Sequence, residues 1–397
     1  MTAGLIAFPV IFLLAVTGIV YLFKDLYEAP GQVNIKQVAR QETALSFQRQ
    51  WEIAKKQWER PVQKMVVPED EGQATEFVSG RHSGKSSFFI NPYTGEPTGN
   101  ITVNESDMYT VRKLHGELLT GRFGTTIVEL VASWLIVLII SGLILFFPRR
   151  LSDCVKLFRI RWRGTRDVLY RDLHQVGGFW FSLLLLLILA GGMPWTNVWG
   201  EGFKWVQKQT GTGYPVTWQG RGLKSTGPTA LQQPMSLDSV VAFAKSQALP
   251  GEISLSMPQG PAGIYSIHNV YFPDQSKQVA IHLNQYSGDE IARLQWSDVG
   301  LLMRGRMWAM AFHQGQFGLW NWLLVLVTAL GLLMLSTSAV LAFFFRKRSS
   351  SPAAPQPSGG PMKRSFYLGI GVLGVFLPLF GASVLVLWIV SALRTRS

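Results

Sequence analysis

The sequence contains a single cysteine, Cys154, among 397 residues. One cysteine excludes an intrachain disulfide, a four-cysteine iron–sulfur cluster and the covalent attachment of c-type haem. Charged residues are also scarce, at 15%, against 48% hydrophobic residues. These proportions are typical of a membrane protein with soluble insertions. Cys154 lies in a basic loop, where an inert thiol is the simplest interpretation.

Acidic residues are few as well, 24 against 37 lysines and arginines, which gives a formal charge of +13. The basic residues lie mainly in short stretches beside apolar runs, as the positive-inside rule describes. No basic stripe with stacking aromatic residues occurs on a soluble segment. The charge therefore indicates a membrane partner and no nucleic acid.

Five apolar stretches are each about 20 residues long, which is enough to cross a bilayer as helices. We expect an α-helical integral membrane protein with about five transmembrane helices and two small α+β periplasmic insertions. The basic segments place their loops in the cytoplasm, so the C-terminus is expected outside. The expected segments are transmembrane helices at 1–24, 125–148, 174–198, 319–345 and 367–392, periplasmic modules at 25–124 and 199–318, a basic cytoplasmic loop at 149–173 and a cytoplasmic linker at 346–366. Within the first helix, Thr17-Gly18 is a small pair suited to helix packing.

The two outer segments are weakly alike. Phe88–Glu96 and Val279–Glu290 each read as an alternating strand that ends in a turn of Tyr, Ser or Thr, and Gly. Amphipathic helices are expected before them, at 42–56 and 237–247, and Ser236 is a candidate cap for the second. Nothing in either copy forms a catalytic constellation, so the pattern predicts two small α+β modules.

Three of the six histidines, His115, His174 and His313, stand at the rims of apolar segments, each with a glycine close by. A metal-binding side chain beside a membrane span is by default a functional hypothesis. Glycine lets a flat macrocycle approach the backbone, so the pattern favours haem iron over histidines that merely pack at the interface. With no attachment cysteines, the haem is expected to be b-type.

The expected topology sorts these histidines by depth. His115 and His313 lie on the outer side, where they can share one haem, while His174 opens its helix at the inner face. A bilayer core of about 30 Å separates the two levels, so a second haem is expected at His174. Other metals fit less well, since no His-x-x-His or Glu-x-x-His pair lies on one helix and the outer pair lacks a third ligand.

Other polar and aromatic residues carry weaker expectations. His82, His268 and His282 are expected to be surface or strand-face histidines, with weak contact to an iron complex as the alternative. Basic residues flanking the outer pair could bind haem propionates or anchor the interface: Arg112, Lys113, Arg122, Arg304 and Arg306. Tryptophans near the outer helix ends are typical of an aromatic belt.

Four segments carry a resemblance to a known family: Lys113–Leu118, Asp172–Trp180, Gly192–Trp195 and Phe312–Trp320. Taken together and in order, they resemble the PepSY-associated transmembrane helix family, and the two outer modules resemble PepSY domains. The resemblance implies a bacterial inner-membrane protein that carries two b-type haems and reduces ferric siderophores in the periplasm.

The sequence departs from the family pattern at its beginning. Members usually carry a histidine just before the equivalent of Ala3-Gly4-Leu5, and here the sequence starts after that point. We expect an upstream extension that supplies this ligand. Without it, the haem at His174 would have a methionine, a water or nothing opposite, with Met334 and Met362 as distant candidates.

The leading functional hypothesis is a transmembrane electron conduit. A cytoplasmic or quinol donor would supply electrons, and a periplasmic ferric siderophore would accept them and release its iron. A structural or regulatory envelope protein without redox activity is the alternative. A transporter for hydrophilic solutes is the weakest reading, because Glu129 is among the few charges in the spans and lies near one end.

Overall fold

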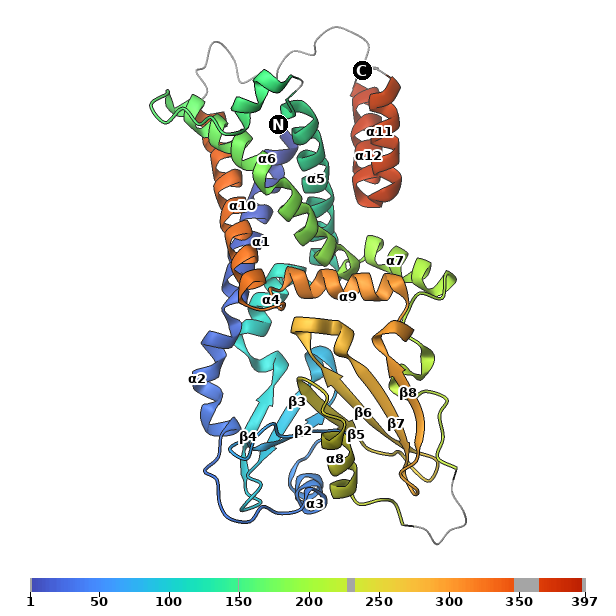
Figure 1. Ribbon diagram of the computed structural model, residues 1–397. Coiled ribbons are helices and arrows are strands. Elements are labelled where there is room, and N and C mark those ends of the chain that lie inside the picture. The colour runs from blue at the N-terminus through green and yellow to red at the C-terminus, as the bar shows by residue number, and fades with distance from the viewer. Residues whose placement is uncertain (1, 149, 227–232, 346–363, 395–397) are drawn as a thin grey trace. The chain divides into compact units, whose positions relative to one another are not determined.

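The computed structural model describes residues 2–148, 150–226, 233–345 and 364–394 (Figure 1). The chain divides into two compact units that each draw on distant parts of the sequence. The membrane unit comprises Met1–Leu22, Val111–Val206 and Ala309–Ser397. The sheet unit comprises Phe23–Thr110 and Gln207–Trp308.

Four helical segments in the described residues are long and apolar enough to cross a membrane: Gly4–Lys36, Arg122–Phe146, Arg166–Trp195 and Leu319–Phe345. They contain the main helices of the membrane unit, which are α1 (Thr2–Leu22), α5 (Arg122–Phe146), α6 (Arg166–Gly192) and α10 (Leu319–Phe345). Helix α10 packs against α1 and α6, and α5 packs against the same two helices. These apolar helices bury little of their surface against each other, which leaves most of it for lipid.

Helix α6 begins earlier than the sequence indicated. It starts at Arg166, inside the segment 149–173 expected to be a loop, so His174 lies within the helix and not at its first residue. Asp172 is buried and accepts two hydrogen bonds of 2.7 Å from the Arg161 guanidinium. This bidentate pair ties the end of the basic loop to α6.

Residues 367–392, expected to be one spanning helix, form two shorter helices instead. These are α11 (Arg364–Phe376) and α12 (Pro378–Arg394), which lie side by side (Figure 1). Pro378 lacks an N–H and is suited to the first position of a new helix, so the chain breaks before it. At 13 and 17 residues the helices are about 20 and 26 Å long, short of a bilayer core of about 30 Å. The expectation of a fifth single crossing is therefore wrong.

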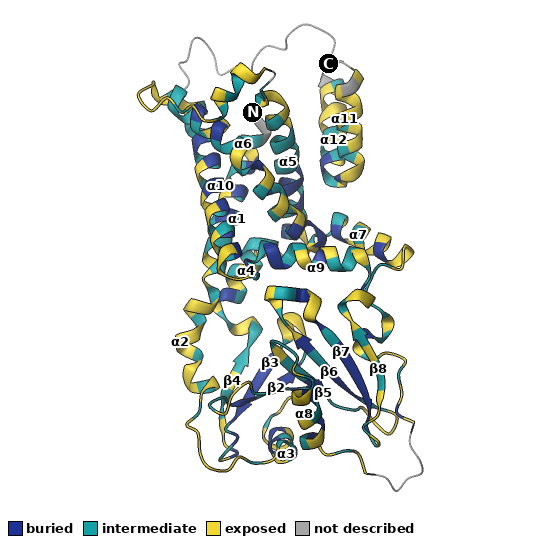
Figure 2. Ribbon diagram, viewed as in Figure 1, coloured by how far each residue is buried: buried dark blue, intermediate teal, exposed yellow. Residues whose placement is uncertain are grey.

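The tip of this hairpin packs on the rest of the membrane unit. Leu377 and Phe380 are buried in a cluster with Ala132 and Met193. The Trp134 indole donates a 3.1 Å hydrogen bond to the Ser383 hydroxyl. The outer faces of α11 and α12 are largely exposed (Figure 2), as suits contact with lipid.

The sheet unit contains one antiparallel sheet of eight strands, in the order β4-β3-β2-β1-β5-β6-β7-β8. The strands are β1 (Lys64–Val66), β2 (Thr75–Ser79), β3 (Ser86–Ile90), β4 (Pro97–Thr102), β5 (Glu252–Ser256), β6 (Ile264–Val270), β7 (Val279–Asn284) and β8 (Glu290–Gln295). The first four come from one expected module and the last four from the other. Pairing of β1 with β5 joins them, so the modules share a sheet and are not separate bodies.

The two halves of the sheet repeat each other in detail. Helix α3 (Phe47–Gln57) precedes the first four strands and is capped by Ser46, while α8 (Leu237–Ser246) precedes the last four and is capped by Ser236, as predicted. Both expected turns are present, each with a glycine at positive φ, Gly95 at 77° and Gly288 at 76°. The register also shifts at matching places, between Phe89 and Ile90 of β3 and between His282 and Leu283 of β7.

One face of the sheet forms the main core. Alternate strand residues such as Phe77, Leu255 and Ile267 are 0% exposed and pack against α3 and α8. Figure 2 shows this band of buried strand residues. The opposite face is covered over β7 by the segment 214–218, where Trp218 packs on Ala280. The remaining helices are α2 (Lys24–Lys36), α4 (Asp107–Glu117), α7 (Val198–Gln209) and α9 (Leu301–His313).

Candidate functional site

The fold brings two of the three rim histidines together. His115 lies in the last turn of α4, and His313 is the last residue of α9. Their ring centroids are 6.2 Å apart and their planes meet at 69°. Both side chains belong to the membrane unit, although they are far apart in the sequence.

His115 is held by the first span. Its Nδ1 is 3.0 Å from the Oγ1 of Thr17 on α1. The neighbouring Gly18 makes this approach possible, because a Cβ there would lie 3.3 Å from the Cε1 of His115. The Thr17-Gly18 pair, expected only to pack helices, thus packs against a candidate ligand.

His313 is held by the third span in a similar way. Its Nδ1 donates a 2.7 Å hydrogen bond to the carbonyl of Ile188 on α6. Gly191 permits the contact, because a Cβ there would lie 2.4 Å from the Ala309 carbonyl and 2.6 Å from the His313 Cβ. Gly192 also faces the imidazole ring. Each of the two histidines is therefore packed against a glycine of a membrane helix, His115 against Gly18 of α1 and His313 against Gly191 of α6.

His174 stands apart from this pair. It lies fourteen residues before Ile188 on α6, about 21 Å away along the helix axis. Its Nδ1 is 3.0 Å from the carbonyl of Leu335 on α10, and the residue as a whole is exposed. Met334 packs beside Gly177, one turn after His174, with its Cε 2.8 Å from the position of a Cβ there. Met362, the other candidate, lies outside the described residues.

The separation of the outer pair would allow both histidines to hold one haem iron. Two metal–nitrogen bonds of about 2 Å, together with the half-widths of two imidazole rings, add to a centroid separation of about 6 Å. The observed 6.2 Å agrees with this value. Because both Nδ1 atoms are engaged elsewhere, the Nε2 atoms are the nitrogens that could bind a metal.

Burial keeps both rings in the form that binds metal. Desolvation, and to a smaller extent the neighbouring His313, lower the pKa of His115 to about 4. Burial also lowers the pKa of His313, against the opposing effect of its bond to the Ile188 carbonyl. Both imidazoles are therefore neutral at pH 7, as metal ligation requires.

The turn after His115 is strained. Leu118 and Leu119 have φ values of 47° and 58°, a region that residues other than glycine rarely adopt. Helix α5 packs closely over this turn, because a Cβ on Gly124 would lie 1.8 Å from the Glu117 carbonyl. Strained backbone of this kind clusters at functional sites.

Of the glycines close to the three rim histidines, some meet other residues and do not leave room for a macrocycle. No heavy atom lies within 4 Å of a Cβ built on Gly116, so this position does leave open space. Gly177 instead accommodates Met334, and Gly315 adopts a φ of 71° and packs against Trp322. The glycines that face the outer histidine rings are Gly18 and Gly192, while Gly191 contacts the Cβ of His313.

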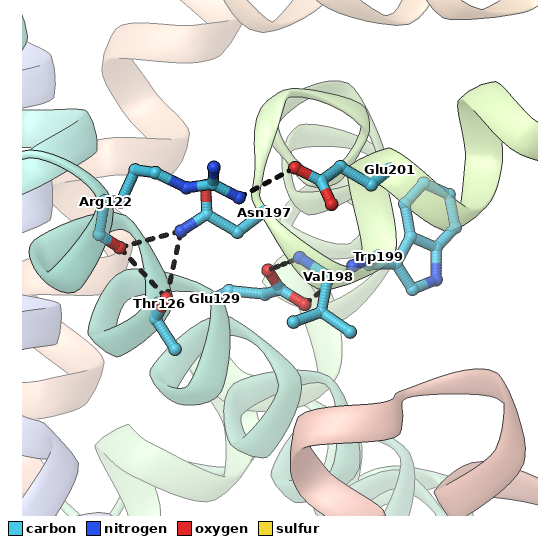
Figure 3. A network of polar contacts seen from close by, with 7 residues as sticks. All are labelled: Arg122, Thr126, Glu129, Asn197, Val198, Trp199 and Glu201. Atoms are coloured by element: carbon cyan, nitrogen blue, oxygen red, sulfur yellow. Dashed lines mark hydrogen bonds and ion pairs between the residues drawn. The ribbon is translucent and has the colours of Figure 1, made fainter.

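Glu129, the charge within the second span, has a structural role (Figure 3). Its carboxylate is fully buried and accepts hydrogen bonds from the backbone N–H groups of Val198 at 2.8 Å and Trp199 at 2.9 Å. These groups begin α7, and a carboxylate at a helix N-terminus is favourable. Nearby, the Arg122 guanidinium pairs with Glu201 at 2.9 Å.

The remaining predicted residues lie in varied environments. His82 is exposed, whereas His282 is fully buried between strands and so is not a surface histidine. Its Nδ1 is 2.9 Å from the Ser266 hydroxyl, and its ring contacts that of His268 at 5.8 Å. Among the propionate candidates, Lys113 already pairs with Glu117. Of the residues that the structure describes, no group of three or more His, Cys, Asp or Glu side chains is placed to hold a metal ion.

Comparison with known proteins identifies the family. No curated protein matches the chain. The model of the PepSY-associated TM region matches residues 1–347. This range covers all eight strands of the sheet, the four long apolar helices and the three rim histidines. The chain therefore belongs to the family of the PepSY-associated TM region.

Proposed function

We propose that this membrane protein is a b-type haem protein of the bacterial inner membrane that passes electrons to a periplasmic ferric siderophore. The observation that carries the proposal is the 6.2 Å separation of the His115 and His313 rings, with both Nδ1 atoms hydrogen-bonded elsewhere. Haem, when bound, supplies a one-electron carrier. Reduction of the siderophore's iron weakens its hold by hard oxygen ligands.

The chain's own residues supply position and environment. Thr17 and the Ile188 carbonyl orient the outer rings, and Gly18 and Gly191 bring the first and third spans against them. Burial favours the neutral form of both rings, which is the form that could bind a metal.

His174 is proposed as a ligand of a second haem. Its Nδ1 is occupied by the Leu335 carbonyl, which leaves Nε2 free in an exposed residue. Its distance of about 21 Å from the outer pair along α6 requires a separate iron. The basic residues of 149–171 support a cytoplasmic location for this end of α6, and therefore outward electron flow from a cytoplasmic or quinol donor.

An absorption spectrum of the purified full chain tests the proposal. We expect a Soret band that shifts on reduction with dithionite. In protein fully loaded with two haems, His115→Ala or His313→Ala should each remove about half of the haem, because one axial bond of the same site is lost. His174→Ala should leave this half in place. The exposed His82, changed to Ala, is the matched control.

A second pair of variants tests the glycine contact. Gly191→Ala forces a methyl group against the Ala309 carbonyl and should displace His313 and weaken haem retention. Gly142→Ala, in open space on α5, should retain haem as the wild type does. Absence of a Soret band in the wild type would refute haem binding, and full haem occupancy in His115→Ala would refute the ligand assignment. A haem-free wild type would favour the structural or regulatory alternative.

A further inference from the structure

The hydroxyl of Thr17 has three polar neighbours and one proton. Its Oγ1 lies 2.7 Å from the Leu13 carbonyl, 3.2 Å from the Leu14 carbonyl and 3.0 Å from the Nδ1 of His115. The side chain is 5% exposed. Two oxygen atoms at 2.7 Å share a hydrogen-bonding proton, and a carbonyl has none to give, so the Thr17 hydroxyl donates to the Leu13 carbonyl.

The proton of the third contact must then come from the imidazole. The Thr17 oxygen accepts from Nδ1–H of His115, because its own proton is already used. A neutral histidine that is protonated at Nδ1 has its lone pair at Nε2. The Thr17 oxygen thus favours a free Nε2 on His115, together with the Leu14 carbonyl, which also hydrogen-bonds to His115.

His313 reaches the same tautomer by a different route. Its Nδ1 lies 2.7 Å from the Ile188 carbonyl, an acceptor that has no proton to give. A backbone carbonyl is fixed by its helix, whereas a hydroxyl rotates about its side-chain bond. His115 and His313 therefore share the Nδ1–H tautomer, but the acceptor is a side-chain hydroxyl for His115 and a backbone carbonyl for His313.

We infer that Thr17 is a positioning residue of the outer site, which holds His115 in the Nδ1–H tautomer and raises the electron-donating strength of its Nε2 through this hydrogen bond. The role in tuning iron rests on the proposed function, whereas the tautomer does not. Hydrogen bonds from the second ring nitrogen fix ring orientation and raise ligand basicity.

The first experiment uses the haem-free full chain, so that it is independent of haem binding. ¹⁵N spectra of labelled histidine should show His115 neutral and protonated at Nδ1 in the wild type. Thr17→Ser, which keeps the hydroxyl, should preserve this tautomer. Thr17→Val, which has nearly the same shape without the acceptor, should increase the share of the Nε2–H tautomer. An unchanged tautomer ratio in Thr17→Val would overturn the inference.

The second experiment measures the midpoint potential of the outer haem in the loaded protein. Loss of the hydrogen bond weakens donation to ferric iron, so Thr17→Val should raise the potential. A tenfold change in the reduction equilibrium is about 59 mV. Thr17→Ser should restore the wild-type value.

Thr328→Val is the matched control. Thr328 is a buried threonine on α10 whose hydroxyl donates to the Leu324 carbonyl of its own helix at 2.6 Å. This substitution should leave both the tautomer and the potential unchanged, and a shift equal to that of Thr17→Val would overturn the inference. If the wild type binds no haem, the proposed function fails, and the tautomer measurement still decides the role of Thr17.

Discussion

The substitution Glu129→Gln tests whether the buried carboxylate is a helix cap. Both carboxylate oxygens of Glu129 accept backbone N–H groups, from Val198 and Trp199, in the first turn of α7 (Figure 3). Glutamine has the same size but only one acceptor oxygen, and its amide nitrogen would face a second donor. One N–H at the start of α7 would then lose its partner inside the protein.

The magnitude follows from the burial and the charge. A hydrogen bond to a charged group contributes about 1.5–3 kcal/mol, and an unpaired buried donor costs about 1–3 kcal/mol. A carboxylate at a helix N-terminus contributes about 0.3–1 kcal/mol more. These three values are not additive, because each includes part of the same interaction between the carboxylate and the backbone N–H groups. We therefore expect Glu129→Gln to lower the free energy of unfolding by about 2–4 kcal/mol.

The assay is denaturant unfolding of the purified protein in detergent, followed by tryptophan fluorescence. Glu201→Gln is the matched control, because the Glu201 carboxylate pairs with Arg122 in an exposed position, with side chains 61% and 81% exposed. Exposed pairs contribute about 0–1 kcal/mol. Equal losses in the two variants, within about 0.5 kcal/mol, would refute the reasoning.

Two further predictions concern pH and topology. Burial lowers the pKa of His268 to about 3 and also lowers that of His282. Histidine in the unfolded chain has a pKa near 6.5, so below that pH the unfolded state binds more protons than the folded state. The free energy of unfolding of the sheet unit should therefore fall by up to about 1.4 kcal/mol per pH unit for each histidine. Hydrogen exchange of β6 and β7 from pH 7 to pH 4 should show this loss of stability. His268→Asn should make stability depend less steeply on pH, and an unaltered dependence in this variant would contradict the prediction. Because α11 and α12 form a hairpin, a reporter placed after Arg394 should lie on the same side of the membrane as one placed after Leu157, and opposite sides would show a single crossing.

Local patterns were enough to predict much of this architecture. Long apolar runs predicted five membrane helices, and the described residues contain four of them, since hydrophobicity over about 20 residues is a property of the segment itself. Ser236 and the turns at Gly95 and Gly288 were predicted correctly because caps and turns depend on residues close in sequence. Pro378 was a local signal for the break between α11 and α12 that the apolar run concealed.

Other features follow only from contacts between distant residues. Thr17 meets His115 across 98 positions, and β1 pairs with β5 to merge two modules into one sheet. Both contacts depend on which surfaces of the protein pack together, and this cannot be predicted from the periodicity of a single segment. The burial of His282 also depends on distant residues. Alternation along β7 predicts on which face of the sheet His282 lies, but not which segment covers that face. The sequence by itself determined which histidines stand beside membrane helices, whereas the tertiary structure decided that His115 and His313 meet, with their Nδ1 atoms engaged and their Nε2 atoms free.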